Sequence, residues 1–161
     1  MKFFMPALFI FYIVLIVNSF SMAWEYKIKE NPLTDEVSAL AYTVSTNQSN
    51  NKAAFVINCN SNKDISVYIK FIAKIASTSK GNTEYVLQRI NKEEPKYVEW
   101  YIDKKNNILY PINNDELLNK LYNANTFTVG TDSPIEEDTI ASFDISNIKT
   151  AMNTVKDKCH K

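Results

Sequence analysis

The chain has 161 residues, and its 18 lysines and arginines balance its 18 aspartates and glutamates, so the formal net charge is zero. Acidic and basic side chains are mixed along the sequence instead of forming blocks, which argues against a nucleic-acid surface, so we expect no nucleic-acid partner. The two glycines of the chain can hardly build a glycine-rich phosphate loop.

The first residues have the layout of a secretory signal. A basic residue, Lys2, precedes a run without charge from Phe3 to Val17, and small residues follow at Ser21-Met22-Ala23. We therefore expect residues 1–23 to be a cleaved signal peptide and residues 24–161 to form a single domain in the periplasm or outside the cell.

The alternative to a signal peptide is a membrane anchor. An anchor needs about 20 predominantly apolar residues, and extending the apolar run that far would have to include Asn18, Ser19 and Ser21. We expect no stable membrane insertion once the signal is removed.

The two cysteines, Cys59 and Cys159, are expected to form a disulfide, because an exported chain reaches an oxidising compartment. The alternatives are a reactive thiol and a metal site. No basic residue or histidine stands beside Cys59 to activate a thiolate, and two cysteines with His160 cannot supply a preformed tetrahedral set of ligands. We expect no metal and no cofactor.

The mature chain begins with two alternating segments. Trp24–Glu30 alternates apolar and charged residues, which predicts a strand with one buried face. Asn31–Asp35 interrupts this strand with turn residues, and a second alternating run spans Val37–Val44. The polar stretch Thr46–Lys52 then predicts a hairpin loop.

The central part of the chain is rich in strand formers. Ala54–Cys59 and Ile65–Phe71, separated by a turn at Asn60–Lys63, predict a buried central hairpin. Further strands are expected at Glu84–Ile90, Tyr97–Ile102, Ile108–Ile112, Thr126–Thr131 and Asp138–Asp144, the last two joined by a Ser133-Pro134 loop. Short strands separated by turn residues at spacings of about ten residues are typical of an antiparallel sandwich or barrel.

Two segments have the periodicity of helices. Asn113 or Asn114 can cap a helix whose apolar stripe is Leu117, Leu118, Leu121 and Tyr122. Ser146 can cap a C-terminal helix whose apolar stripe is Ile148, Ala151, Met152, Val155 and Cys159. We therefore expect a mainly β fold, an antiparallel β-sandwich with two short helices, one of them C-terminal, and one disulfide.

Catalytic residue sets are scarce in this sequence. The single histidine, His160, lies at the end of the chain, which largely excludes a serine or cysteine hydrolase, because a nucleophile needs an adjacent base. The paired carboxylates Asp35-Glu36, Glu93-Glu94 and Glu136-Glu137-Asp138 all fall in expected turns, where they are usually solvated. We expect the protein not to be an enzyme.

Three residues are candidate contacts for a ligand or partner. Arg89, the only arginine, lies within an expected strand, where its guanidinium offers a planar fork to a carboxylate or phosphate. The alternative for Arg89 is a structural ion pair or a cross-strand contact. Trp24 and Trp100 are open to the same two interpretations, since indoles serve as ligand platforms but more often pack in cores or at their rims.

An ordered set of features gives the chain a family resemblance. The features are Trp24 after the signal, Asn31–Glu36, the strand ending in Cys59, the Arg89 strand, Trp100, the Leu117-Leu118 helix, Phe143–Ile148 followed by a helix, and Cys159. This layout resembles the small periplasmic β-sandwich proteins related to the type VI secretion accessory protein called TagO or VasI. The chain departs from that family at Asn58, where an arginine is usual, and at Asn147, where a glycine is common, which implies a distant relative.

The resemblance implies a non-enzymatic binding or accessory protein of the cell envelope, whose partner is an envelope or secreted protein. Two alternatives remain: an enzyme or enzyme inhibitor acting on envelope polymers, with Arg89 and a turn carboxylate at its site, and an invasion-associated periplasmic protein of the IalB type. A cleft that brings Arg89 against a buried carboxylate favours catalysis or ligand binding, whereas a flat apolar patch favours a partner protein.

Overall fold

A computed structural model describes residues 24–34, 36–46, 52–59, 64–73, 75, 77, 80–131 and 140–159. The expected signal peptide, the turn at residues 60–63 and the Ser133-Pro134 loop lie outside the described residues. The strands are β1 (Glu25–Glu30), β2 (Val37–Val44), β3 (Ala53–Cys59), β4 (Ile65–Phe71), β5 (Thr83–Ile90), β6 (Lys96–Asp103), β7 (Ile108–Pro111), β8 (Thr126–Thr131) and β9 (Ile140–Asp144). The helices are α1 (Asn114–Leu121) and α2 (Ile148–Cys159).

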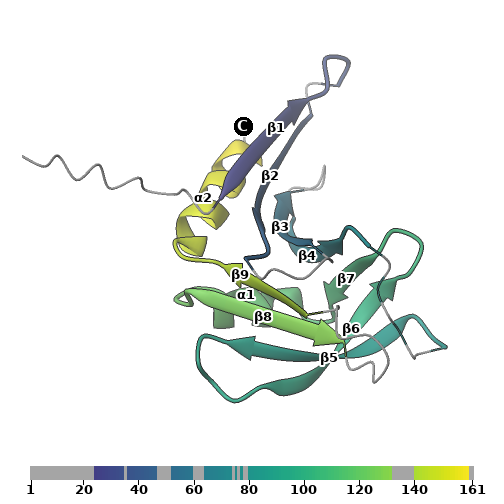
Figure 1. The fold of residues 1–161 in the computed structure, drawn as a ribbon. Helices are drawn as coiled ribbons and strands as arrows, with labels where there is room; N and C mark the ends of the chain where they lie inside the picture. Colours follow the sequence, from purple (N-terminus) through teal and green to yellow (C-terminus); the bar gives the residue numbers. More distant parts are fainter. Residues whose placement is uncertain are drawn as a thin grey trace, which may run out of the picture.

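The nine strands found in the described residues all belong to one antiparallel sheet, in the order β1-β2-β3-β4-β7-β6-β5-β8-β9. The sheet curls, so that the half containing β1–β4 stands against the half containing β5–β9 (Figure 1). Just beyond β2, the amide of Thr46 donates a hydrogen bond of 2.7 Å to the carbonyl of Ser142 on β9. The two halves of the sheet therefore meet again on the side away from the β4–β7 junction.

The core lies between these halves and is built from aromatic rings. Phe55 of β3 lies 5.7 Å from Phe127 of β8 and 6.0 Å from Phe143 of β9, measured between ring centroids. All three rings are at most 1% exposed. The expectation of a mainly β, antiparallel fold with two helices is confirmed, and its two layers are the two halves of one continuous sheet.

Helix α1 is held at its start by two adjacent asparagines with different roles. Asn113 is the N-cap, and its side-chain oxygen accepts a hydrogen bond of 3.1 Å from the amide of Glu116. Asn114 instead bonds to strand β4: its Nδ2 donates to the Ile65 carbonyl at 2.9 Å, and its Oδ1 accepts from the Val67 amide at 2.8 Å. The second asparagine therefore docks the helix on the sheet.

Helix α2 begins one residue later than the sequence indicates. The carbonyl of Asn147 accepts hydrogen bonds from the amides of Thr150 (2.9 Å) and Ala151 (3.2 Å), so Asn147 holds the cap position and Ser146 does not. The backbone of Asn147 is left-handed, with φ 63°, a conformation that asparagine tolerates better than serine. The Ser146 amide donates to Asp144 Oδ1 instead.

A disulfide joins Cys59 of β3 to Cys159 of α2, with the two Cα atoms 6.1 Å apart and 100 residues apart in sequence. The expected pairing is confirmed. The bond fastens α2 over the inner face of β2 and β3, where Ala39, Ala41 and Ile57 are buried. In the chain-entropy model, closing a loop of this length constrains the unfolded chain by about 4 to 5 kcal/mol.

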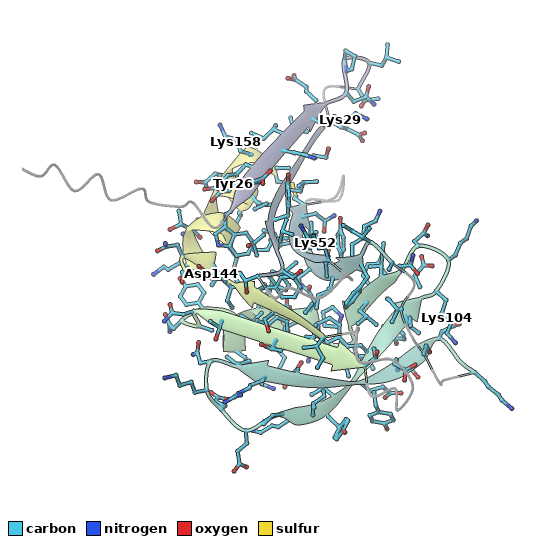
Figure 2. All side chains as sticks on the ribbon, viewed as in Figure 1. Tyr26, Lys29, Lys52, Lys104, Asp144 and Lys158 are labelled. Carbon is cyan, nitrogen blue, oxygen red and sulfur yellow. A yellow bond between two sulfur atoms is a disulfide. The ribbon has the colours of Figure 1, made fainter. Side chains whose placement is uncertain are left out.

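Strand β1 is less buried than its alternation predicts. Tyr26 is half-buried, but the other residues of β1 are exposed, and Ile28 is 53% exposed. The reason is position: β1 is an edge strand, and the β1–β2 hairpin projects beyond the second half of the sheet, as Lys29 shows in Figure 2. The prediction of one buried face for Trp24–Glu30 is therefore wrong beyond Trp24 and Tyr26.

No helix in the part of the chain that the structure describes is long and apolar enough to cross a membrane.

Candidate functional site

Both tryptophans lie in the core. Trp24 is 4% exposed, its Nε1 donates a hydrogen bond of 2.9 Å to the Ser146 carbonyl, and its ring meets Phe55 edge-on at 6.1 Å. Trp100 is 1% exposed and stacks on Phe127 at 6.4 Å. Trp24 offers no surface to a partner and acts by packing, whereas Trp100 packs in the core and also lines a hollow beside Gln88.

Arg89 lies apart from both tryptophans, exposed on the outer face of β5. Its Nε donates to the Glu93 carbonyl at 2.9 Å and its Nη2 to the Lys92 carbonyl at 3.4 Å. These bonds stabilise the turn between β5 and β6, where Asn91 is left-handed with φ 51°. The structure records no ion pair between Arg89 and a carboxylate within its described residues.

The outer face of β4, β7, β6 and β5 carries five tyrosines, which we call the tyrosine face: Tyr68, Tyr85, Tyr97, Tyr101 and Tyr110. Exposure is 63% for Tyr85, 57% for Tyr97 and 50% for Tyr101. Tyr101 is directly opposite Tyr110 in the β6–β7 register, and the Tyr110 and Tyr68 rings lie 5.7 Å apart. The strands position these rings because side chains two residues apart share one face.

Charged groups complete this surface. Glu99 lies between Tyr97 and Tyr101 on β6 and directly opposite Tyr85 on β5, so its carboxylate stands among exposed rings. Arg89 follows Tyr85 on the same face of β5, four residues further along the strand. The tyrosine face therefore has an acidic centre and a basic end.

The phenol groups of Tyr68 and Tyr110 keep their protons at neutral pH. Burial raises the pKa of Tyr68 above its ordinary value of 10.0, and the neighbouring Tyr110 adds to this rise. Burial also raises the pKa of Tyr110, with a further contribution from the Asp103 carboxylate. Both hydroxyls are therefore available as hydrogen-bond donors.

A second feature, which we call the Gln88 cleft, lies between α1 and the first half of β6. It consists of two adjoining hollows of about 320 and 250 Å³ that share Gln88 and Lys120. The cleft is open because β7 pairs with β6 only from Trp100 onward. Its apolar walls come from Val98, Trp100, Pro111, Ile112 and Leu117.

Gln88 is the unusual residue of this cleft. Its side chain is on the inner face of β5 and only 8% exposed, yet its carboxamide oxygen has no hydrogen-bond partner among the described residues. The rim carries four carboxylates and two ammonium groups: Glu93, Glu94, Glu99, Glu116, Lys96 and Lys120. Lys120 is already paired with Glu116 at 2.5 Å.

Sequence reasoning named neither the tyrosine face nor the Gln88 cleft. The alternation of Tyr97, Glu99 and Tyr101 with Trp100 and Ile102 was a usable signal for the tyrosine face. It places three residues with polar ends on one face of the strand and the apolar residues on the other face. No local signal marks Gln88, since its surroundings depend on where β7 ends and α1 begins.

In the described ranges of the chain, no group of three or more His, Cys, Asp or Glu side chains is placed to hold a metal ion. Glu84 is a buried carboxylate, 7% exposed, and accepts a hydrogen bond from the Ser77 hydroxyl. No protein-family model, no curated protein and no solved structure matches this chain.

Proposed function

We propose that the mature domain is a non-enzymatic binding protein of the cell envelope or the secreted fraction, and that the tyrosine face contacts a partner protein. The observation that carries the proposal is that Tyr85, Tyr97 and Tyr101, each at least half exposed, lie on one face of the neighbouring strands β5 and β6, where Tyr85 is the diagonal cross-strand neighbour of the other two. Scattered exposed apolar residues are ordinary, but contiguous ones mark interaction surfaces. Tyrosine and arginine are also the residues most enriched where protein interfaces hold their binding energy.

The chemistry of the face defines the partner. Tyrosine rings favour apolar contact and their hydroxyls favour hydrogen-bond acceptors such as main-chain carbonyls. Glu99, in the middle of the rings, favours a basic side chain. The expected partner is therefore a protein surface that presents a lysine or arginine among apolar groups.

The surroundings of Arg89 favour binding over the enzymatic alternative. An envelope-polymer enzyme of the kind considered above would use Arg89 with a buried carboxylate, whereas Arg89 is exposed and bonds to the carbonyls of Lys92 and Glu93. A guanidinium at the rim of a tyrosine-rich surface is typical of a protein interface.

The Cys59–Cys159 disulfide supports an extracytoplasmic location, because such bonds persist in oxidising compartments. The resemblance to the TagO or VasI relatives supports an accessory role in the envelope, including one in type VI secretion. A role of the IalB type would use the same exported, disulfide-bonded design.

The proposal is tested by site-specific photo-crosslinking in the producing cells. A photoreactive phenylalanine analogue replaces Tyr101 in one variant and Leu33, which is 92% exposed at the tip of the β1–β2 hairpin, in the control. The expected result is a crosslinked partner from position 101 that does not form from position 33.

The purified partner is then titrated with variants of the protein. We expect Tyr85→Ala with Tyr101→Ala to weaken binding by at least about tenfold, or ~1.4 kcal/mol. Tyr122→Ala is the matched control, because Tyr122 lies at the end of α1, under the Lys149 ammonium. Equal crosslinking from both positions, or affinities within about twofold of the wild type for the double variant, would overturn the proposal.

A further inference from the structure

We propose that the Gln88 cleft receives an arginine side chain of the partner, whose guanidinium donates to the Gln88 carboxamide oxygen. This inference rests on the proposed function, because Glu99 belongs both to the tyrosine face and to the lining of the cleft. A partner lying on the tyrosine face would reach the cleft beside Glu99.

The first argument is the unpaired carboxamide. Native proteins pair nearly all of their buried polar atoms, and an exception calls for an explanation. Gln88 is 8% exposed and lines both hollows, and its carboxamide oxygen is buried without a hydrogen-bond partner among the described residues. An incoming ligand would therefore meet this oxygen after a half-turn of the carboxamide. A ligand that supplies an N–H group would complete its hydrogen bonding.

The second argument is the charge of the rim, which decides what kind of donor enters. A half-turn about the last side-chain torsion exchanges the carboxamide oxygen and the NH₂ group, so Gln88 can present either an acceptor or a donor. An anionic ligand would use the NH₂ group, but Glu93, Glu94 and Glu99 outnumber the one ammonium, Lys96, that is not paired with Glu116. The negatively charged rim therefore favours a cationic ligand, and a cationic donor pairs with the carboxamide oxygen of Gln88.

The third argument is the shape and polarity of the walls. Val98, Ile112 and Leu117 offer apolar surface to a methylene chain that leads to the charged group. A hollow of about 250 Å³ has the volume of roughly eight water molecules at ~30 Å³ each, which is enough for one long side chain.

Arginine suits this cleft better than lysine. A guanidinium is more weakly hydrated than an ammonium, so it loses less on entering a partly buried cleft. Its five N–H groups also reach the Gln88 oxygen and a rim carboxylate such as Glu94 together. We therefore assign arginine as the occupant.

The probe is the peptide N-acetyl-Ala-Arg-Ala-amide, titrated into the mature protein while the side-chain amide resonances of Gln88 are followed by NMR. Its matched control carries citrulline, which has the shape of arginine without the charge. We expect the arginine peptide to shift the Gln88 resonances saturably and to bind at least about tenfold tighter than the citrulline peptide. Raising the salt concentration should weaken this binding, because the rim carboxylates are exposed.

Two variants separate binding from folding. Gln88→Met keeps the length of the side chain but removes the acceptor, so it should abolish the saturable shift of neighbouring resonances while raising the urea midpoint of unfolding. Asn153→Met, on the exposed side of α2, is the control and should leave peptide binding unchanged. Equal affinity for the two peptides, or arginine binding that survives in Gln88→Met, would overturn the assignment.

The peptide titration uses no partner protein, so its outcome is independent of the crosslinking experiment. Crosslinking from Tyr101 without arginine binding would leave the tyrosine face as an interface and remove the Gln88 cleft from it. Arginine binding without crosslinking would leave the cleft as a binding site and overturn the proposed partner surface.

Discussion

At Gln88, the side chain that suits the proposed ligand lowers the stability of the folded protein. An unpaired buried polar atom costs about 1 to 3 kcal/mol, a large share of the 5 to 15 kcal/mol by which domains are typically stable. Apolar residues of similar volume would fill the position at the inner face of β5 without that penalty, as Val86 does two residues earlier. The ligand proposed above would offset this cost by pairing with the carboxamide oxygen.

Tyr68 and Tyr110 give the protein a defined response to alkaline pH. Their pKa values are raised in the folded state, mainly by burial. A raised folded pKa means that stability is fully present below the pKa of about 10 of an unfolded tyrosine and is lost as pH rises through the folded value. We therefore expect the free energy of unfolding to fall above pH ~10.

The test compares urea unfolding of the wild type with that of a Tyr68→Phe, Tyr110→Phe double variant across this pH range. The double variant should lose less stability than the wild type between neutral and alkaline pH, because it lacks the two phenols. Parallel curves for the two proteins would contradict the assignment of the loss to Tyr68 and Tyr110. The exposed Tyr85, changed to phenylalanine in the same way, is the control.

At the scale of elements, the sequence predicted strands well wherever both a pattern and a packing partner exist. The bounds of β2, β4 and β8 agree with those expected from alternation and from the turn residues between them. Strand β1 shows the limit: its alternation is as regular as that of β2, but an edge strand in a projecting hairpin has little to pack against. Alternation reports which residues share a face, and only the tertiary fold decides whether that face is covered.

The order of the strands in the sheet could not be predicted from the sequence. The hairpin β5–β6 and the strand β7 enter the sheet in reverse order, so that β4 pairs with β7 through Ile69 and Lys70. This pairing brings Tyr68 and Tyr110, which are 42 residues apart in sequence, together on the outer face of the sheet. Contacts of this kind depend on chain topology, which local periodicity does not encode.

The start of α1 yields a prediction at this scale, because its two asparagines do different work. Asn113→Ala removes a cap and should cost about 1 kcal/mol of stability. Asn114→Ala removes two hydrogen bonds to β4 and leaves the Ile65 carbonyl and the Val67 amide unpaired, so it should cost more, about 2 to 4 kcal/mol.

Urea unfolding of the two variants checks this order. A larger loss for Asn113→Ala than for Asn114→Ala would show that the cap, and not the bond to the sheet, holds the helix in place. The order matters for binding, because α1 forms one wall of the Gln88 cleft through Leu117 and Lys120. We expect Asn114→Ala to weaken arginine binding as well.

For the whole molecule, the class of fold and the disulfide followed from the sequence, whereas the proposed binding surfaces did not. The two faces of β6 illustrate the reason. Val98, Trp100 and Ile102 form the more apolar face and turn inward, which leaves Tyr97, Glu99 and Tyr101 outside. The sequence drew attention to Trp100 as the rarer residue, but a large indole is most valuable in the core, and the partner surface that we propose is formed by the tyrosines on the other face of the strand.

The Cys59–Cys159 bond also determines how the molecule carries mechanical load. When the chain is pulled at Trp24 and Cys159, tension passes through the sulfur bridge and bypasses the segment between the cysteines, which stand 100 positions apart in sequence. Only the segment from Trp24 to Cys59 can then lengthen, whatever happens to the rest of the sheet. Under reducing conditions the bypassed segment joins the load path, and at 3.3–3.6 Å per residue the extended length should grow by about 330 to 360 Å.

Single-molecule stretching with handles at these two positions measures that difference directly. An equal extension with and without reductant would show that the bridge does not carry the load. If it does, a force applied between Trp24 and Cys159 can separate β1, β2 and β3 at most, while β5 and β6, which carry Tyr85, Gln88 and Tyr101, stay outside the load path.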